Sequence, residues 1–183
     1  VIIMDGAIEL GRTSVNALGI WSFTPTTAMS DGPHSLTLRV SDAAGNLSAP
    51  TTAFTLTVDT ATPTVGAIPI VNDNVGAVQG DLTTGSRSDD NTPTLSGTVE
   101  PNAIVSIYDG NTLLTTVVAN GLGAWTYTPA ALSDGIHRFS TTVSDAAGNV
   151  SDRSPVFTLT IDTTPPVAAT NITVSDNVGP VLG

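Results

Sequence analysis

The sequence contains no cysteine and no lysine among its 183 residues. The lack of Cys excludes disulfide bonds, which commonly stabilise small proteins outside the cell. The lack of Lys excludes intramolecular Lys–Asn isopeptide bonds, a second kind of covalent cross-link. If the protein needs an added source of rigidity, bound metal ions remain as a candidate.

Basic side chains are scarce, and the acidic ones are mostly aspartate. Five Arg stand against fourteen Asp and two Glu, which gives a net charge of −11. We expect no nucleic-acid partner, because binding to phosphate requires clustered Lys and Arg. Asp favours turns, where its side chain bonds to its own backbone, and it is also a preferred oxygen ligand for calcium.

Long apolar runs and catalytic motifs are missing as well. No run of 18 apolar residues occurs, so we expect no membrane insertion. The sequence has no Gly-x-Ser-x-Gly nucleophile turn, no His-Glu-x-x-His zinc motif and no phosphate-binding Gly loop. We therefore expect that the protein is not an enzyme.

An internal repeat organises the chain. The stretch SDAAGN at residues 41–46 recurs at 144–149, which is 103 residues later, and Asp31-Gly32 recurs at the same offset. Upstream of Asp31 the offset is 104, so that Trp21 matches Trp125. Repeats of this kind indicate a tandem array of similar structural units.

The repeat divides the chain into three parts. Residues 1–62 form the back part of one repeat, residues 63–165 a complete repeat, and residues 166–183 the beginning of a third. Val1 aligns with Val105, so the first repeat has no counterpart of residues 64–104 in this chain. We expect that residues 1–62 cannot form a full sandwich by themselves.

The complete repeat has the pattern of short strands separated by Gly, Pro, Asn and Asp. Thr, Val and Ile dominate these strands, as half-buried pleated surfaces favour. We predict seven strands, at residues 67–71, 94–99, 103–108, 112–118, 124–128, 136–144 and 155–161. The predicted fold is therefore all-β, with tandem seven-stranded immunoglobulin-like Greek-key β-sandwiches.

Several stretches of the complete repeat, in their order and spacing, identify a family resemblance. They are DNVG at 73–76, SDDNTPTLSGT at 88–98, GAWTYTP at 123–129, DG at 134–135, DAAGN at 145–149 and IDTTPP at 161–166. The repeat resembles the bacterial immunoglobulin-like repeats of giant biofilm-associated adhesins that are exported by type I secretion. The resemblance implies a secreted rod of many repeats at the bacterial cell surface, in which calcium stiffens the joints.

A first candidate metal site lies at the joint between the first and the complete repeat. In a seven-stranded sandwich, the loop after strand two and the loop after strand six lie at the pole where the chain enters. These loops carry Glu100, Asp145 and Asn149, and Asp59 ends the preceding repeat. Calcium takes six to eight oxygen ligands, so we predict that these four side chains hold a calcium ion at the joint.

A second candidate site lies in the segment between strands one and two. Asp73, Asp89 and Asp90 belong to this segment, and Asp81 lies between them in sequence. Carboxylates held close together repel one another unless a cation lies among them. We predict a calcium site here, at the pole where the chain leaves the repeat.

The repeat extends the set of candidate ligands. Asp162 ends the complete repeat as Asp59 ends the first, so it is expected to contribute to the next joint. Asp42 and Asp176 are the repeat equivalents of Asp145 and Asp73 and complete the predicted set.

A structural role competes with each of these predictions. The run at 89–91 could be an Asx turn, and the DAAGN stretch could be a tight loop with Gly148 at positive φ. Asp31 and Asp134 are predicted as structural turn residues, and His34 and His137, which follow those turns, are predicted as structural too.

Trp125 and Tyr127 are two residues apart and so lie on one face of a strand. A sugar-binding platform is conceivable, but Trp21 and Phe23 repeat the pattern in the first repeat. Core packing is therefore the favoured interpretation.

Two functions remain open at this point. The leading hypothesis is a spacer segment of a cell-surface adhesin involved in biofilm formation or attachment, whose partners are the neighbouring repeats of the same chain. The alternative is a binding module, in which a repeat itself binds a glycan, a host protein or another adhesin copy.

Overall fold

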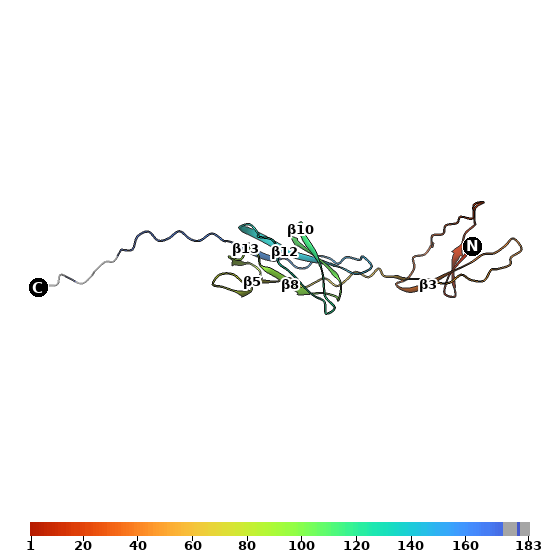
Figure 1. Ribbon diagram of the computed structural model, residues 1–183, viewed down its shortest axis with the longest axis horizontal. Coiled ribbons are helices and arrows are strands. Elements are labelled where there is room, and N and C mark those ends of the chain that lie inside the picture. Colours follow the sequence, from red (N-terminus) through yellow and green to blue (C-terminus); the bar gives the residue numbers. More distant parts are fainter. Residues whose placement is uncertain (174–178, 180–183) are drawn as a thin grey trace.

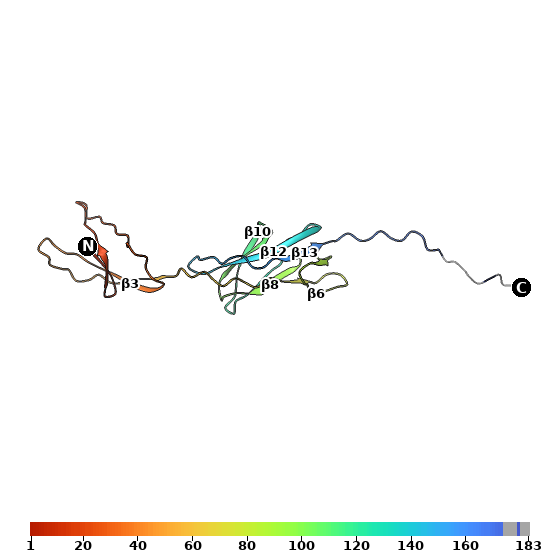
Figure 2. The ribbon, with the colours of Figure 1, turned by 180° about the vertical axis from the view of Figure 1, so that it is seen from behind.

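A computed structural model describes residues 1–173 and residue 179 of the chain. Two groups of strands follow one another along the long axis, joined by an extended segment near residue 60 (Figures 1 and 2). The described residues contain strands, turns and loops but no helix. Accordingly, no helix of the described part is long and apolar enough to cross a membrane.

The first group is a single antiparallel sheet. It consists of β1 (Ile2–Asp5), β2 (Ile8–Arg12), β3 (Gly32–Arg39) and β4 (Phe54–Val58). The strand order is β2-β1-β3-β4. One face of this sheet carries the apolar side chains that a sandwich would bury against a second sheet.

The complete repeat forms two sheets. Its strands are β5 (Ile70–Asp73), β6 (Gly80–Asp81), β7 (Ser86–Ser88), β8 (Thr94–Thr98), β9 (Ile104–Asp109), β10 (Thr112–Val118), β11 (Ala124–Tyr127), β12 (Gly135–Ser144) and β13 (Phe157–Ile161). One sheet has the order β10-β9-β12-β13-β7 and the other the order β11-β8-β5-β6. The pairing of β13 with β7 is parallel, whereas the other strand pairs are antiparallel. The all-β, immunoglobulin-like prediction is confirmed.

Two short strands add to the seven predicted ones. The strands β6 and β7 lie in the segment between the first two predicted strands, where runs of two and three residues leave no detectable alternation. The first strand was predicted at residues 67–71, but in the structure it is β5, which begins three residues later, at Ile70. Pro69 lacks the backbone N–H that a ladder needs, and pairing with β8 begins only at Ile70.

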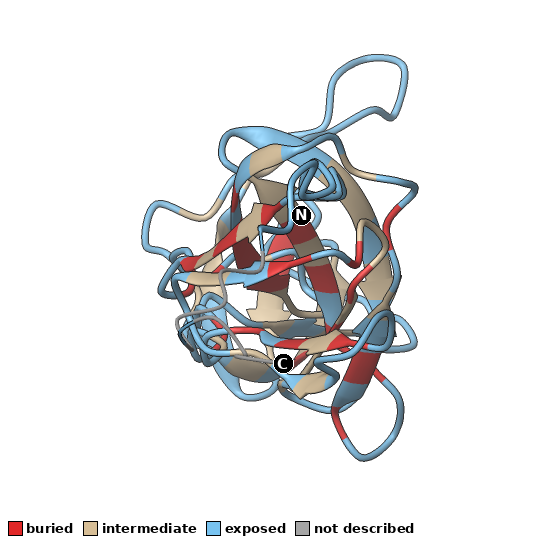
Figure 3. Ribbon diagram, turned by 90° about the vertical axis from the view of Figure 1, so that its left-hand side faces the viewer, coloured by how far each residue is buried: buried red, intermediate tan, exposed pale blue. Residues whose placement is uncertain are grey.

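The core of the complete repeat lies between its two sheets. Buried residues recur along the strands, as the red segments of the ribbon in Figure 3 show, and in β13 they alternate with half-buried ones. The core includes Val71, Leu95, Val105, Ile107, Phe139, Phe157 and Leu159. Trp125 is only 6% exposed. Its indole packs over Gly97, where an added Cβ would lie 3.0 Å from the ring. Core packing of Trp125 is thus confirmed.

A His–Asp pair links the same two neighbouring strands in each repeat, β9 with β12 in the complete repeat and β1 with β3 in the first. Nδ1 of His137 lies 2.7 Å from Oδ2 of Asp109, and Nε2 lies 2.9 Å from the carbonyl oxygen of Ser133. Both ring nitrogens therefore face acceptors, which a ring satisfies fully only when both nitrogens carry a proton. His34 makes the same contacts with Asp5 and Ser30 in the first repeat.

These contacts favour the imidazolium form. Burial acts to lower the pKa of His137, but the bonds to Ser133 and Asp109 outweigh it and raise the pKa above its usual value. The bond to Asp5 likewise raises the pKa of His34. A raised folded-state pKa means that the pair stabilises the fold fully below the unfolded-state pKa of about 6.5. The stabilisation is lost as the pH rises through the folded-state pKa.

We predict that the free energy of unfolding of the complete repeat falls as the pH rises above about 6.5, because the raised pKa of His137 makes the folded state hold this proton more tightly than the unfolded state does. The His137→Gln variant should remove most of this dependence. Urea unfolding at several pH values, followed by the NMR signal of the Trp125 indole, measures it. The His34→Gln variant is the control, since it should leave the slope of the complete repeat unchanged. A slope that survives His137→Gln would contradict the assignment.

Candidate functional site

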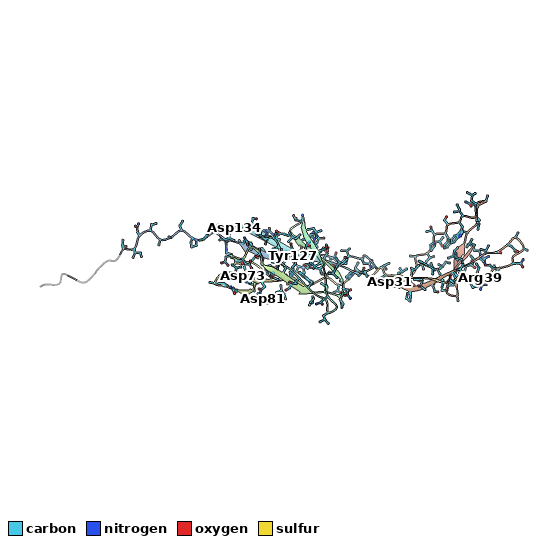
Figure 4. The ribbon with its side chains drawn as sticks, in the orientation of Figure 1. Asp31, Arg39, Asp73, Asp81, Tyr127 and Asp134 are labelled. Carbon is cyan, nitrogen blue, oxygen red and sulfur yellow. The ribbon has the colours of Figure 1, made fainter. Side chains whose placement is uncertain are left out.

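The linker that leaves the first repeat is held by an aspartate of that repeat. Asp31 precedes β3, and its Oδ1 accepts hydrogen bonds from the backbone nitrogen of Thr60 at 3.0 Å and from its hydroxyl at 2.8 Å. Figure 4 shows Asp31 beside the segment that joins the two groups of strands. The bonds fix the direction in which the chain leaves β4.

The same linker is held by loops of the complete repeat. Oε1 of Glu100 accepts a bond from the backbone nitrogen of Thr64 at 3.1 Å, and Nδ2 of Asn149 donates to the carbonyl oxygen of Asp59 at 3.0 Å. Pro63 is buried between these two contacts and its ring fixes φ there. We call residues 59–64, with the side chains that bond them, the joint.

Of the four predicted joint residues, Asp59 lies in the linker itself, and two others reach the linker through hydrogen bonds. Glu100 and Asn149 bond the linker directly. Asp145 instead organises its own loop: its carboxylate accepts from the backbone nitrogens of Gly148 and Asn149, at 2.8 and 2.9 Å, and from Nδ2 of Asn149 at 2.8 Å. The Asn149 bond is the main cause that lowers the pKa of Asp145. Asp145 thereby positions Asn149 for its bond to Asp59.

Asp42 repeats this loop in the first repeat. Its carboxylate accepts from the backbone nitrogens of Ala44 and Asn46 and from the Asn46 side chain, at 3.0, 2.8 and 2.8 Å. The Asn46 side chain is the main cause of its lowered pKa. Gly45 has φ of 91° and its counterpart Gly148 has φ of 95°, as expected of the tight-loop interpretation.

At the opposite pole, Asp73 and Asp90 are buried and fully engaged with their neighbours. Ser88 donates its hydroxyl to Oδ2 of Asp73 at 2.6 Å, and the backbone nitrogen of Val75 donates to Oδ1 at 2.9 Å. Asp90 accepts from the backbone of Thr92 at 2.8 Å and from that of Asn74 at 3.2 Å. Asp90 therefore ties the segment after β5 to the segment before β8.

Asp73, Asp89 and Asp162 line one cavity at this pole, with a volume of about 300 Å³. The parallel pairing of β7 with β13 brings Asp162 there, since its backbone nitrogen donates to the Ser88 carbonyl at 2.9 Å. Arg87 also lines the cavity, with Nη1 3.9 Å from Oδ2 of Asp162. Three carboxylates against one guanidinium leave the cavity with an excess of negative charge.

Asp81 and Asp90 do not line this cavity. Asp81 accepts a bond from the side chain of Asn72 at 2.9 Å. The Asp90 carboxylate is bonded by the backbone nitrogens of Asn74 and Thr92. Asp176 lies outside the described residues. Within the part that the structure describes, no three acidic or histidine side chains are already spaced to coordinate one metal ion.

Asp31 and Asp134 take part in the joints, a role that the sequence analysis missed. Asp134 accepts from the backbone nitrogen of Thr163 at 3.0 Å and from its hydroxyl at 2.8 Å, as Asp31 does with Thr60. These bonds lower the pKa of Asp134, chiefly through the Thr163 hydroxyl. Figure 4 shows Asp134 near the segment that leaves the complete repeat. The sequence contains a signal for this role: in both repeats, the Asp lies 29 residues before the Thr that it bonds.

We predict that the double variant Asp31→Ala, Glu100→Ala loosens the joint, because each side of the linker loses an acceptor. Residual dipolar couplings should fit one alignment tensor for both repeats in the native chain and two different tensors in the variant. The control is Glu9→Ala, which removes the other glutamate at a site where it bonds only Arg12 in the described contacts. Unchanged couplings in the double variant would show that these bonds do not set the angle.

These repeats are similar to domains of known proteins. The family described as bacterial Ig-like domain matches residues 1–60 and 67–163. Exoglucanase B of Cellulomonas fimi is 33% identical over 173 residues, a match that covers 88% of this chain and 14% of that protein. A solved structure titled "Biofilm associated protein - BSP domain" is 19% identical, with a TM-score of 0.38, and the match covers 90% of this chain and 25% of that one.

The chain thus spans only a small part of the length of each of these two relatives. The family match covers both repeats and leaves out only residues 61–66 of the linker between them. The chain belongs to the bacterial Ig-like domain family.

Proposed function

We propose that these repeats are spacers of a large extracellular protein, and specifically of a cell-surface adhesin, in which they transmit tension and carry no catalytic site. The observation that supports this best is the joint, where residues 59–64 are hydrogen-bonded by the repeat before and the repeat after. A linker held from both sides keeps two sandwiches end to end. Membership of the bacterial Ig-like family supports the extracellular setting.

Tension along the chain loads the complete repeat in shear. The chain enters at the pole of the joint and leaves after β13 at the other pole (Figure 1). β13 runs parallel to β7, with Leu159 opposite Ser86 and Ile161 opposite Ser88. Pulling the two ends apart therefore slides these strands past each other, so that their hydrogen bonds are loaded together. Such bonds resist force better than bonds that open one at a time.

We predict that Ser88→Pro lowers the force at which the complete repeat unfolds. The Ser88 carbonyl accepts a bond from the backbone nitrogen of Asp162, so the backbone N–H of the same residue faces β13, and proline removes it. Single-molecule force spectroscopy on the chain, pulled from its ends, measures this force. Ser88→Ala is the matched control, since it removes the same hydroxyl but keeps the N–H. Equal unfolding forces in the two variants would contradict the shear mechanism and weaken the spacer proposal.

We further propose that calcium binds in the cavity lined by Asp73, Asp89 and Asp162. Carboxylate oxygens are the ligands that calcium prefers, and a cation there would offset the excess negative charge. Asp89 and Asp162 are exposed and would turn inward to coordinate the ion. The Asp73 carboxylate is already bonded by Ser88 and Val75, so Asp89 and Asp162 would supply most of the carboxylate oxygens. At the joint of residues 59–64, the Asp145 carboxylate is likewise held by its own loop.

Calcium should raise the melting temperature of the complete repeat. Extracellular modules bind calcium with dissociation constants of about 10⁻⁴–10⁻³ M. At about 10 mM calcium, such a site stabilises the fold by about 1.4–2.7 kcal/mol, or roughly 6–20 °C for a domain of this size. Differential scanning calorimetry in calcium and in chelator measures the shift.

The double variant Asp89→Asn, Asp162→Asn should abolish the calcium shift, and Asp152→Asn, at an exposed aspartate away from the cavity, should keep it. A melting curve that is the same in calcium and in chelator would remove calcium from the proposal. The spacer function would stand, because it depends on the hydrogen-bonded joint and on the shear geometry.

A further inference from the structure

One edge of the complete repeat is formed by a long strand that carries no charge. β10 has the sequence TLLTTVV and ends the sheet β10-β9-β12-β13-β7. It lies at the periphery of the complete repeat in Figures 1 and 2. Proteins usually protect such an edge with charged side chains, proline or a short strand, because its free backbone groups can pair with a strand of another chain. β10 has none of these three features.

The other edge strands of the complete repeat are shorter. β7, at the far edge of the same sheet, has three residues, and its middle residue is Arg87. The second sheet ends in β11, with four residues, and in β6, with two residues that include Asp81. β10 therefore offers the longest uncharged edge of the complete repeat.

The equivalent edge of the first repeat is protected by charge. With the offset of 104, β2 corresponds to residues 112–116 of β10. β2 carries Glu9 and Arg12, whose side chains form an ion pair at 2.8 Å. Their counterparts in β10 are Leu113 and Thr116. The uncharged edge is therefore a property of this one repeat and not a requirement of the shared fold.

The pairing of β10 with β9 shows which backbone groups are free. Ala119 donates its backbone nitrogen to the carbonyl oxygen of Ala103 at 2.9 Å. Successive residues of a strand turn their backbone groups to opposite sides, and the pairing beyond the bulge of β10 is regular. Thr116 and Val118 therefore point their N–H and C=O groups away from β9, to a side where the described residues place no strand. One long bond of 3.5 Å reaches the Thr116 carbonyl, from the Thr115 hydroxyl.

Apolar side chains lie beside these free backbone groups. Val118 is 66% exposed, and Ile104, its neighbour across the strand pair, is 41% exposed. Leu113, toward the other end of β10, is 51% exposed. The edge thus offers apolar area as well as hydrogen-bonding groups to an added strand.

We propose that β10 is a self-association edge, at which it pairs antiparallel with β10 of a second copy of this chain. Val117 of each copy lies opposite Val117 of the other, so that Thr116 of each copy bonds Val118 of the other. This register is two-fold symmetric and uses the free groups of both residues in both copies. The interaction goes beyond the spacer function and does not depend on it.

The chemistry of the edge favours this partner. Unpaired peptide groups along a strand are satisfied by another extended strand. The chain has a net charge of −11, so most surfaces of two copies repel each other. Two β10 strands can meet without bringing like charges opposite one another, which would oppose strand pairing. The Thr and Val side chains of β10 also favour a paired strand.

Thr116→Pro tests the proposal in the full chain. The N–H of Thr116 points away from β9, so proline removes a group that association needs but no bond of the sheet, as edge strands tolerate. Thr116→Val is the matched control, because it keeps this N–H. Sedimentation over a range of concentrations measures the mass of the particle, and scanning calorimetry shows that each variant is folded.

We expect the mass of the native chain and of Thr116→Val to rise toward twice that of one chain as the concentration increases. Thr116→Pro should stay at the mass of one chain, with a melting temperature close to that of the native chain. A native chain that stays single at every concentration overturns the proposal. Association of Thr116→Pro that is as strong as that of the native chain overturns it as well, because another surface is then responsible.

A cysteine cross-link tests the register independently of proline. The chain has no cysteine, so one introduced thiol reports on one position. Val117→Cys should form a disulfide-linked dimer under mild oxidation, since residues directly opposite each other in a non-hydrogen-bonded pair have Cα atoms about 4.5 Å apart, within the reach of a disulfide.

Thr112→Cys is the control for the cross-link. It lies on the same strand and is exposed, but in this register the two copies of residue 112 are roughly 30 Å apart. Cross-linking of Val117→Cys alone supports the proposal. Cross-linking of neither variant, or of both at the same rate, overturns it.

Discussion

The structure depends on the burial of one sheet against another. A single sheet of four strands can form most of its hydrogen bonds, but it leaves half of its side chains without an apolar environment. The two repeats of this chain show both sides of that constraint. In the complete repeat, which contains β5 and β8, Trp125 and Phe157 are buried in the core. In residues 1–60, where the structure describes one sheet, the corresponding positions, Trp21 and Phe54, are exposed.

The loops at the two poles depend on this packing in turn. Once the sheets are stacked, the loops that carry Glu100 and Asn149 lie at one pole and the cavity of Asp73 and Asp162 at the other. Polar side chains of these loops then connect the repeats by hydrogen bonds to the linker. Asp145 fixes a loop so that Asn149 reaches the linker, and Asp31 holds the linker from the other side. The joint is thus built from the same Asp-rich turns that end the strands.

Much of the fold could be predicted from the sequence, because repetition and alternation report on burial. The offset of 103 residues located the equivalent strands, and the repeated Trp21 and Phe23 identified a core position rather than a sugar platform. The short strands β6 and β7 escaped prediction since two or three residues carry no period. The hydrogen bonds of Asp31 and of His137 were missed for a different reason. A polar side chain has many possible partners, and only the folded chain shows which one lies within reach.

The joint has a consequence for how long such a protein can be. Asp134 holds the exit of the complete repeat as Asp31 holds the exit of the first, and Glu100 and Asn149 hold the chain that enters. A repeat of this kind carries both halves of the connection, one at each pole. Copies can therefore be gained or lost from an array without redesigning any boundary, so the reach of the array can change by whole units through simple recombination between similar gene segments.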